Sequence, residues 1–233
     1  MTAIFRSARP ANAEEPFYNI GESLLMVLES NPLPNPLSSR VVAMHHPENV
    51  DLYLLPGSIN ITSFEENLAA AETMKASFTR NIPGAIHHHL QQVGHAVGAK
   101  VILIDTSPSM GCLNRVVVMS SSYWLMPCQA DHFSLEALKS ARRNISNTWV
   151  AKMAELRDYT KISAYPLPDR NPIFLRVINQ MFTIKRGRAT LAFRTYIDRI
   201  NTEVTAELIP ALQQHNMLSA MKRLVCRPIA SPQ

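Results

Sequence analysis

The chain has 233 residues, of which 46% are hydrophobic and 18% charged, and its formal net charge at pH 7 is +5. This composition is that of a globular protein and excludes general disorder, and no apolar run approaches the ~20 residues of a membrane-spanning helix. Three cysteines are too few for a disulfide framework and too scattered for a zinc site, and the first residues hold no apolar core of signal-peptide length. We therefore expect a cytoplasmic protein that does not associate with the membrane.

The positive charge is concentrated in the second part of the chain. Up to residue 138 there are seven lysines and arginines against twelve acidic residues, whereas from residue 139 onward there are sixteen against six. A polyanion would bind the C-terminal part, although solvated helix faces explain the same charges.

The first half of the chain alternates between helical and strand patterns. Residues 1–16 lack periodicity and are expected to form a loose arm. Elements are then expected in this order: a helix from Phe17, short strands in RVVAM and VDLYLLPGS, a helix from Ser63 that the Ser63 hydroxyl caps, and a helix in PGAIHHHLQQVGHAVGA.

The second half opens on a run that decides the fold class. Val101–Ile104 is continuously apolar and rich in β-branched residues, as expected of a central parallel strand covered on both faces, with Asp105 at its carboxyl end. Further strands are expected in SYWLMP and IFLRVINQMF, a crossover helix at 134–156, and final helices at 188–208 and 217–224. This alternation predicts an α/β fold with a doubly wound, mainly parallel sheet and helices on both faces, spanning residues 17–228 before a short tail at 229–233.

The stretch VILIDTSPSMG…VVVMSSSYWLMPCQADHFSLEAL resembles the ParA/MinD group of P-loop ATPases, which partition plasmids and chromosomes. The resemblance consists of an apolar strand, D-x-x-P, a helix, an apolar strand ending in proline, a polar loop and then F-S-L-E-x-L. Such proteins bind ATP and Mg²⁺, form an ATP-bound dimer that binds DNA, and work with a ParB-like partner protein.

The resemblance also implies roles for individual residues. Asp105 would be the catalytic residue that holds magnesium, because a hard cation bridging phosphates takes oxygen ligands at the carboxyl edge of a sheet. A turn former or helix cap is the plainer interpretation of Asp105. Nucleotide contacts would come from Thr106 and Pro108 and from Asn179 or Gln180, and Asp131 with Phe133 would lie at the rim of the nucleotide site or of the dimer.

The phosphate-binding loop of that family has no counterpart in this sequence. The seven glycines, at positions 21, 57, 84, 94, 98, 111 and 187, include none followed by lysine and serine or threonine in a P-loop pattern. Phosphoryl transfer depends on such positioning and electrostatics, so we expect impaired hydrolysis. The chain is thus expected to lack an N-terminal segment, either because its gene product is incomplete or because it is a degenerate homologue.

Basic residues in the C-terminal part are candidates for contacts with DNA, which needs only clustered positive charge for nonspecific binding. The candidates are Arg142, Arg143, Lys185, Arg186, Arg188 and Arg194. Two other functions fit the same sequence: a non-hydrolysing scaffold that binds a protein through its switch surface, and a constitutive DNA-binding protein.

Six histidines in two groups invite a metal-site interpretation: His45, His46, His87, His88, His89 and His95. Consecutive histidines on a helix point about 100° apart and do not chelate well together. We therefore expect exposed polar residues of a helix at 87–89.

Overall fold

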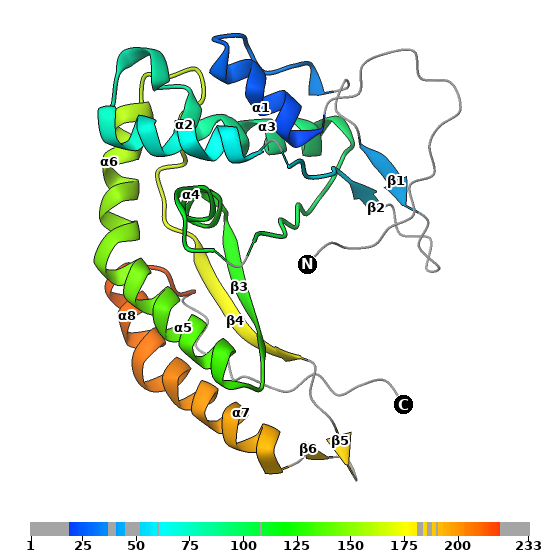
Figure 1. Cartoon of the computed structure of the whole chain (residues 1–233), viewed down its shortest axis with the longest axis vertical. Coiled ribbons are helices and arrows are strands. Elements are labelled where there is room, and N and C mark those ends of the chain that lie inside the picture. Colours follow the sequence, from blue (N-terminus) through cyan, green and yellow to red (C-terminus); the bar gives the residue numbers. More distant parts are fainter. Residues whose placement is uncertain are drawn as a thin grey trace. The chain divides into compact units, whose positions relative to one another are not determined.

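The computed structural model describes eight segments of the chain: residues 19–36, 41–44, 52–59, 61–107, 109–180, 184–185, 188–189 and 191–219 (Figure 1). The expected arm at 1–16, the tail at 229–233 and most of the expected helix at 217–224 lie outside these segments. The chain divides into two compact units. Unit 1 contains residues up to Asn114 together with Leu156–Leu167, and unit 2 contains Arg115–Glu155 and the residues from Pro168 onward.

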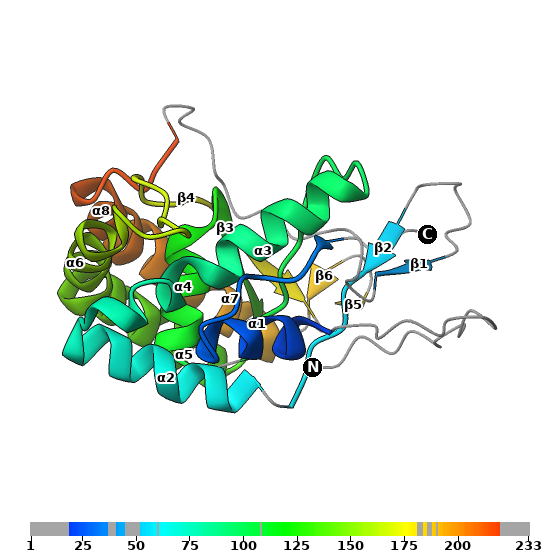
Figure 2. The ribbon, with the colours of Figure 1, turned by 90° about the horizontal axis from the view of Figure 1, so that it is seen from above.

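Unit 1 is built on three helices that pack on one another, α1 (Ile20–Leu28), α2 (Ile61–Met74) and α3 (Ile82–Ala96) (Figure 2). The start of α1 is fixed by a capping box, in which Asn19 accepts from the Glu22 amide at 3.0 Å and Glu22 accepts from the Asn19 amide at 2.9 Å. The α2 helix begins at Ile61, so Ser63 lies inside the helix and the prediction that it caps the helix was wrong.

The two expected short strands of unit 1 are confirmed. They are β1 (Val42–Met44) and β2 (Leu52–Leu54), and they pair with each other in antiparallel register. The antiparallel pair departs from the mainly parallel sheet that the sequence predicted.

The return segment Leu156–Leu167 closes unit 1 against its earlier helices. A Cβ atom added to Gly84 of α3 would lie 1.7 Å from the Tyr165 carbonyl oxygen, so only glycine allows this approach. The Tyr165 hydroxyl accepts a hydrogen bond from the Leu33 amide at 2.9 Å. The Tyr159 hydroxyl bonds to the Thr79 hydroxyl at 2.7 Å and donates to the Ala76 carbonyl, next to the 3₁₀ helix η2 (Ser77–Thr79). Residues far apart in sequence thereby become one unit.

The segment Val101–Ile104 does not form the expected buried parallel strand. It has no regular secondary structure, and Figure 1 draws the chain between α3 and α4 as coil. The side chains of Val101 and Leu103 are 81% and 84% exposed. Among the described residues no strand pairs with this segment, and an apolar run without a neighbouring strand lacks ladder hydrogen bonds.

Unit 2 is organised around two parallel strands, β3 (Tyr123–Gln129) and β4 (Ile173–Gln180), which confirm two expected strands (Figure 1). The register shifts once, between Trp124 and Met126. The Trp124 ring lies 4.6 Å from the Phe174 ring between centroids. On its other edge β4 meets residues 217–218, where the Phe174 amide donates to the Met217 carbonyl at 2.8 Å.

Two long helical segments of unit 2 each contain a π-helical stretch. The first runs through α5 (His132–Asn144), η3 (Ile145–Trp149) and α6 (Val150–Thr160). The second runs through α7 (Leu191–Glu203), η4 (Val204–Leu208) and α8 (Ile209–Gln214). The α5 helix packs on α7, as Figure 1 shows. Helices in both regions were expected, but the π-helical turns were not.

The remaining elements are α4 (Cys112–Ser120) and a small antiparallel pair, β5 (Ile184–Lys185) and β6 (Arg188–Ala189). The first three residues of α4 belong to unit 1 and the rest to unit 2. The last five residues of α6 belong to unit 1, whereas its first part belongs to unit 2.

Candidate functional site

The best-formed polar site of unit 2 lies at the carboxyl ends of β3 and β4, where parallel sheets bind their ligands. Cys128 pairs in register with Asn179, and Gln129 pairs with Gln180. Because the chain leaves β3 at Gln129 and enters α5 at His132, the start of α5 lies at the same edge.

The start of α5 is held in place by two hydrogen bonds. The Asp131 carboxylate accepts from the Ser134 amide at 2.7 Å, and the Ser134 hydroxyl accepts from the Gln129 amide at 2.9 Å. Asp131 is therefore an N-cap, a role that aspartate fills well because its oxygen satisfies an amide that the helix leaves without a partner. The hydrogen bond from Ser134 occupies one carboxylate oxygen of Asp131, which the sequence predicted to lie at the rim of the nucleotide site or of the dimer.

Asn179 is the most informative residue at this edge. Its side chain is buried, with 4% of the residue exposed, and its Oδ1 atom has no hydrogen-bond partner among the described residues. A buried amide oxygen without a partner costs roughly 1–3 kcal/mol, and a ligand donor would remove that cost. The neighbouring Gln180 is half-buried.

Phe133 projects from the first turn of α5 and is 82% exposed. Its ring lies 6.1 Å from the His132 ring between centroids, in an edge-to-face arrangement. An exposed aromatic ring beside a polar strand edge offers a face on which a planar ligand can stack.

A second set of expected residues lies in unit 1, in the loop that leads into α4. Asp105 and Thr106 are exposed, and Pro108 lies outside the described residues. The loop is held by Asn114, whose side-chain amide donates to the Ser107 carbonyl at 2.5 Å and to the Ser109 carbonyl at 2.7 Å. The structure thus brings Asp131, Phe133, Asn179 and Gln180 to one strand edge of unit 2, whereas Asp105 and Thr106 belong to unit 1.

Sequence reasoning missed Asn114, although it is buried and fixes the loop after Asp105. A second contact of the same loop joins the Cys112 thiol to the Glu65 carbonyl of α2 at 3.3 Å. An amide at the start of a helix that follows a serine-rich turn was the available signal for Asn114, because such side chains bond to nearby backbone.

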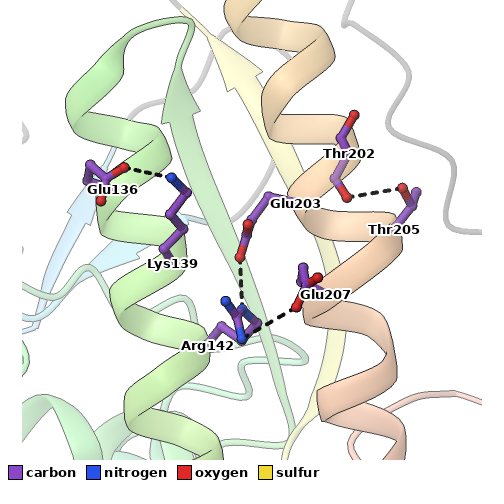
Figure 3. Close-up of polar contacts among 7 residues, drawn as sticks. All are labelled: Glu136, Lys139, Arg142, Thr202, Glu203, Thr205 and Glu207. Carbon is purple, nitrogen blue, oxygen red and sulfur yellow. Dashed lines mark hydrogen bonds and ion pairs between the residues drawn. The ribbon is translucent and has the colours of Figure 1, made fainter.

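The basic candidates differ in their surroundings. Arg143 and Arg194 are exposed. Arg142 is paired, with its Nε atom 2.8 Å from Glu203 and its Nη1 atom 3.7 Å from Glu207 (Figure 3). The backbones of Lys185 and Arg188 lie in β5 and β6, and Arg186 lies outside the described residues.

The histidine cluster on α3 is not uniformly exposed. His89 is fully buried and His87 and His88 are half-buried, so the prediction of exposed residues at 87–89 was wrong. Burial follows from helix geometry, because His89 follows Ala85 and Ile86 by four and three residues and lies on the same buried face. His45 and His46 lie outside the described residues.

The described side chains fit only part of the ATP and Mg²⁺ that the family resemblance implies. No group of three or more histidine, cysteine or acidic side chains suited to a metal ion occurs in the described part of the chain. Asp105 offers one carboxylate, and Mg²⁺ is commonly held by one or two carboxylates with substrate phosphates. The Asn179 Oδ1 atom, which has no hydrogen-bond partner among the described residues, could accept a hydrogen bond from a nucleotide base. The sequence has no glycine-rich loop that could bind the phosphates.

Comparison with known proteins defines the class. A family model described as AAA domain matches residues 19–156, which is more than half of the chain. The chain therefore belongs to this family of ParA/MinD-like P-loop proteins, an ATPase domain family with the P-loop NTPase fold. No curated protein matches the sequence at a significant level.

A solved structure supports the fold. The crystal structure of protein DIP2308 from Corynebacterium diphtheriae matches with a TM-score of 0.51 and 17% sequence identity, over 83% of this chain and 73% of that chain. At this identity the likeness concerns the fold alone. Among the described helices none is long and apolar enough to cross a membrane.

Proposed function

We propose that this chain binds an adenine nucleotide at the carboxyl edge of β3 and β4 and acts as a ParA-like switch that associates with DNA. Hydrolysis of ATP by this chain is slow or absent. The observation that carries the proposal is the buried Asn179 Oδ1 atom, which has no hydrogen-bond partner in the described residues.

The chemistry of the edge suits a purine base. The exocyclic amine of adenine donates hydrogen bonds, and the Asn179 oxygen accepts one, as asparagine does where proteins read adenine in DNA. The exposed ring of Phe133 provides a stacking surface at the same edge. A guanine base presents a carbonyl oxygen at the position of that amine, so the Asn179 oxygen favours adenine.

The described residues offer fewer binding groups for the phosphates of the nucleotide than for its base. Bound Mg²⁺ would neutralise phosphate charge, but among the described residues of unit 2 no group of side chains suited to a metal ion lies at this edge. The sequence has no lysine in a glycine-rich loop to neutralise the rest. Binding without rapid turnover follows, because phosphoryl transfer is driven by such neutralisation. In this proposal the sheet of the complete fold is doubly wound and mainly parallel.

The test is a fluorescence titration of the full chain with a ribose-labelled ATP and ADP. The wild-type chain should bind with saturation, and Asn179→Leu should weaken binding about 10- to 100-fold, which corresponds to the loss of one buried hydrogen bond to ligand. Asn201→Leu is the matched control, since Asn201 in α7 also has a buried Oδ1 atom with no hydrogen-bond partner among the described residues.

Two results contradict the proposal. One is equal affinity in wild type and Asn179→Leu, and the other is no saturable binding at about 5 mM nucleotide. In the second case a stable stoichiometric complex with a ParB-like partner would support a non-hydrolysing scaffold, and DNA binding that ignores nucleotide would support a constitutive DNA-binding protein.

A further inference from the structure

Three large apolar side chains of unit 1 are exposed on two stretches of chain that pack together. Met74, the last residue of α2, is 62% exposed, and Phe78 of η2 is 74% exposed. Ile162, in the return segment Leu156–Leu167, is 78% exposed. Single exposed apolar residues are common on proteins, whereas a group of them marks an interaction surface. Met74, Phe78 and Ile162 are called the apolar group below.

Hydrogen bonds hold the two stretches that carry the apolar group side by side. The Tyr159 hydroxyl donates to the Ala76 carbonyl, and the Asn81 side-chain oxygen accepts from the Ala164 amide at 3.0 Å. The last two members of the apolar group lie between these cross-links, one on each stretch. A surface that is already cross-linked in the free chain loses little conformational entropy when it binds a partner.

Basic residues of unit 1 gather around the apolar group, although the described residues of the unit are acidic in total. Residues 72–81 and 156–164 hold four basic side chains against two acidic ones, namely Lys75, Arg80, Arg157 and Lys161 against Glu72 and Asp158. The other described residues of unit 1 hold Lys100 against Glu22, Glu29, Glu65, Glu66 and Asp105. This contrast gives the surface a positive charge that complements an acidic partner.

Two of these basic residues are fixed at the junction of the stretches. The Arg80 guanidinium lies over the Tyr159 ring, 5.6 Å from its centroid. Lys75 is exposed and follows α2 with a φ of 46°, in the left-handed region that favours glycine. A strained backbone of this kind is common at functional sites. The lysine therefore keeps a positive charge beside Met74 at a position where glycine would fit the backbone better.

We propose that the apolar group and the basic side chains around it bind an acidic segment of a partner protein. The segment is a helix with apolar residues on one face and carboxylates beside that face. Phenylalanine, methionine and arginine are enriched in protein interfaces, and all three occur here. The phosphates of DNA would pair with the basic residues but would leave the apolar group uncovered. The surface shares no residue with the β3–β4 edge, so its test is independent of nucleotide binding.

The test is the fluorescence anisotropy of a labelled synthetic peptide titrated with the full chain. The peptide is an amphipathic helix with leucines on one face and glutamates beside them. The chain should bind it with saturation and with an affinity that falls as salt rises. One control peptide has lysines in place of the glutamates, and another has serines in place of the leucines. Each control should bind at least about 10-fold more weakly.

The apolar contribution is tested by Phe78→Ser. This variant should weaken binding of the glutamate peptide about 10-fold or more, because a large apolar side chain is lost from the contact. The matched control is Ile59→Ser. Ile59 is 90% exposed in the same unit and lies at the other end of α2 from Met74, so this variant should bind as the wild type does.

The charge contribution is tested by Lys161→Glu, which should weaken binding several-fold. Lys100→Glu changes an exposed lysine outside this surface and should leave binding unchanged. The double variant Lys75→Glu/Lys161→Glu should reverse the preference, so that the lysine peptide binds better than the glutamate peptide. General stickiness of exposed apolar residues predicts no such reversal.

A separate readout concerns the backbone at Lys75. Lys75→Gly should weaken peptide binding without lowering the melting temperature, because glycine adopts a positive φ readily. A variant that loses melting temperature and keeps its affinity would show that this lysine has a structural role only, which contradicts its place in the binding surface.

No saturable binding of the glutamate peptide up to about 1 mM, the dissociation constant of a very weak complex, overturns the proposal. Equal weakening in Phe78→Ser and Ile59→Ser overturns it as well. Vesicles of phosphatidylserine and phosphatidylcholine test a lipid surface as the alternative. A chain that sediments with these vesicles through Phe78 and does not bind the peptide shows that the proposal is wrong. Circular dichroism confirms that each variant is folded before its affinity is interpreted.

Discussion

At the scale of single residues, His89 has the most unusual environment in unit 1. It is fully buried in α3, and neither ring nitrogen has a hydrogen-bond partner among the described residues. Burial, with a smaller effect of the neighbouring His88, lowers the pKa of His89 to about 4. The fold therefore accepts the neutral imidazole, and a protonated His89 must lose its proton before the ring packs.

The pH dependence of stability follows from that shift. The pKa of His89 is about 6.5 in the unfolded chain and about 4 in the folded one, so between these values the unfolded state binds more protons. Stability present above pH 6.5 is lost as the pH falls toward 4. At pH 5 the loss is about 2 kcal/mol.

We expect His89→Leu to remove this loss, measured as the difference between urea unfolding free energies at pH 7 and pH 5. The exposed His95 on the same helix is the control, and His95→Leu should keep the wild-type difference. An identical pH dependence in wild type and His89→Leu would show that the buried imidazole is not its cause.

At the scale of elements, Arg142 links α5 to the α7–η4 segment by ion pairs. Its guanidinium joins Glu203, whose side chain is 11% exposed, and Glu207, whose side chain is 54% exposed (Figure 3). The better-buried Glu203 loses its counter-charge if the arginine is removed, and a half-buried carboxylate without a partner is costly.

Arg142→Leu should therefore lower the free energy of unfolding by about 1–3 kcal/mol in urea titrations. Lys139 on the same helix is the matched comparison. It bonds to Glu136 at 2.8 Å, which lowers the pKa of Glu136. The Lys139 and Glu136 side chains are 36% and 45% exposed, so Lys139→Leu should change stability much less than Arg142→Leu. Equal effects of the two substitutions would argue against a structural role for the Arg142 pair.

The elements also show what sequence patterns predict well. Helices at α1, α3 and α5 follow from apolar spacing, a signal that acts within a few residues. The caps Asn19 and Asp131 were not predicted. Strands β3 and β4 follow from short apolar runs bounded by turns. Such local signals need no knowledge of the rest of the chain.

Features that depend on distant partners were not predictable in the same way. Val101–Ile104 has the composition of a buried strand, but a strand exists only where another strand pairs with it. Arg142 carried the pattern of a DNA contact, and only the spatial approach of Glu203 reveals the ion pair. The two acidic residues four apart at 203 and 207 are the signal that sequence offered, since they share one helix face.

At the scale of the whole molecule, charge is distributed unevenly along the chain. The residues after 138 carry ten more basic than acidic side chains, within a net charge of +5. A polyanion such as DNA gains affinity from this excess by releasing its counterions, so the affinity should fall steeply with salt. The exposed Arg143 and Arg194 belong to this excess, whereas Arg142 is neutralised by Glu203 and Glu207.

We predict that the full chain shifts a nonspecific duplex at low salt and that the double variant Arg143→Gln/Arg194→Gln binds more weakly. The logarithmic dependence of affinity on salt should become less steep by about 2 in the double variant, because two phosphate contacts are lost. Arg142→Gln should keep the wild-type salt dependence even where it lowers stability, since its charge is already committed to two carboxylates. A salt dependence that Arg142→Gln reduces as much as the double variant would show that the Arg142 charge contacts DNA despite its two carboxylate partners, which contradicts the prediction. No shift at low salt would remove DNA from the function of this chain.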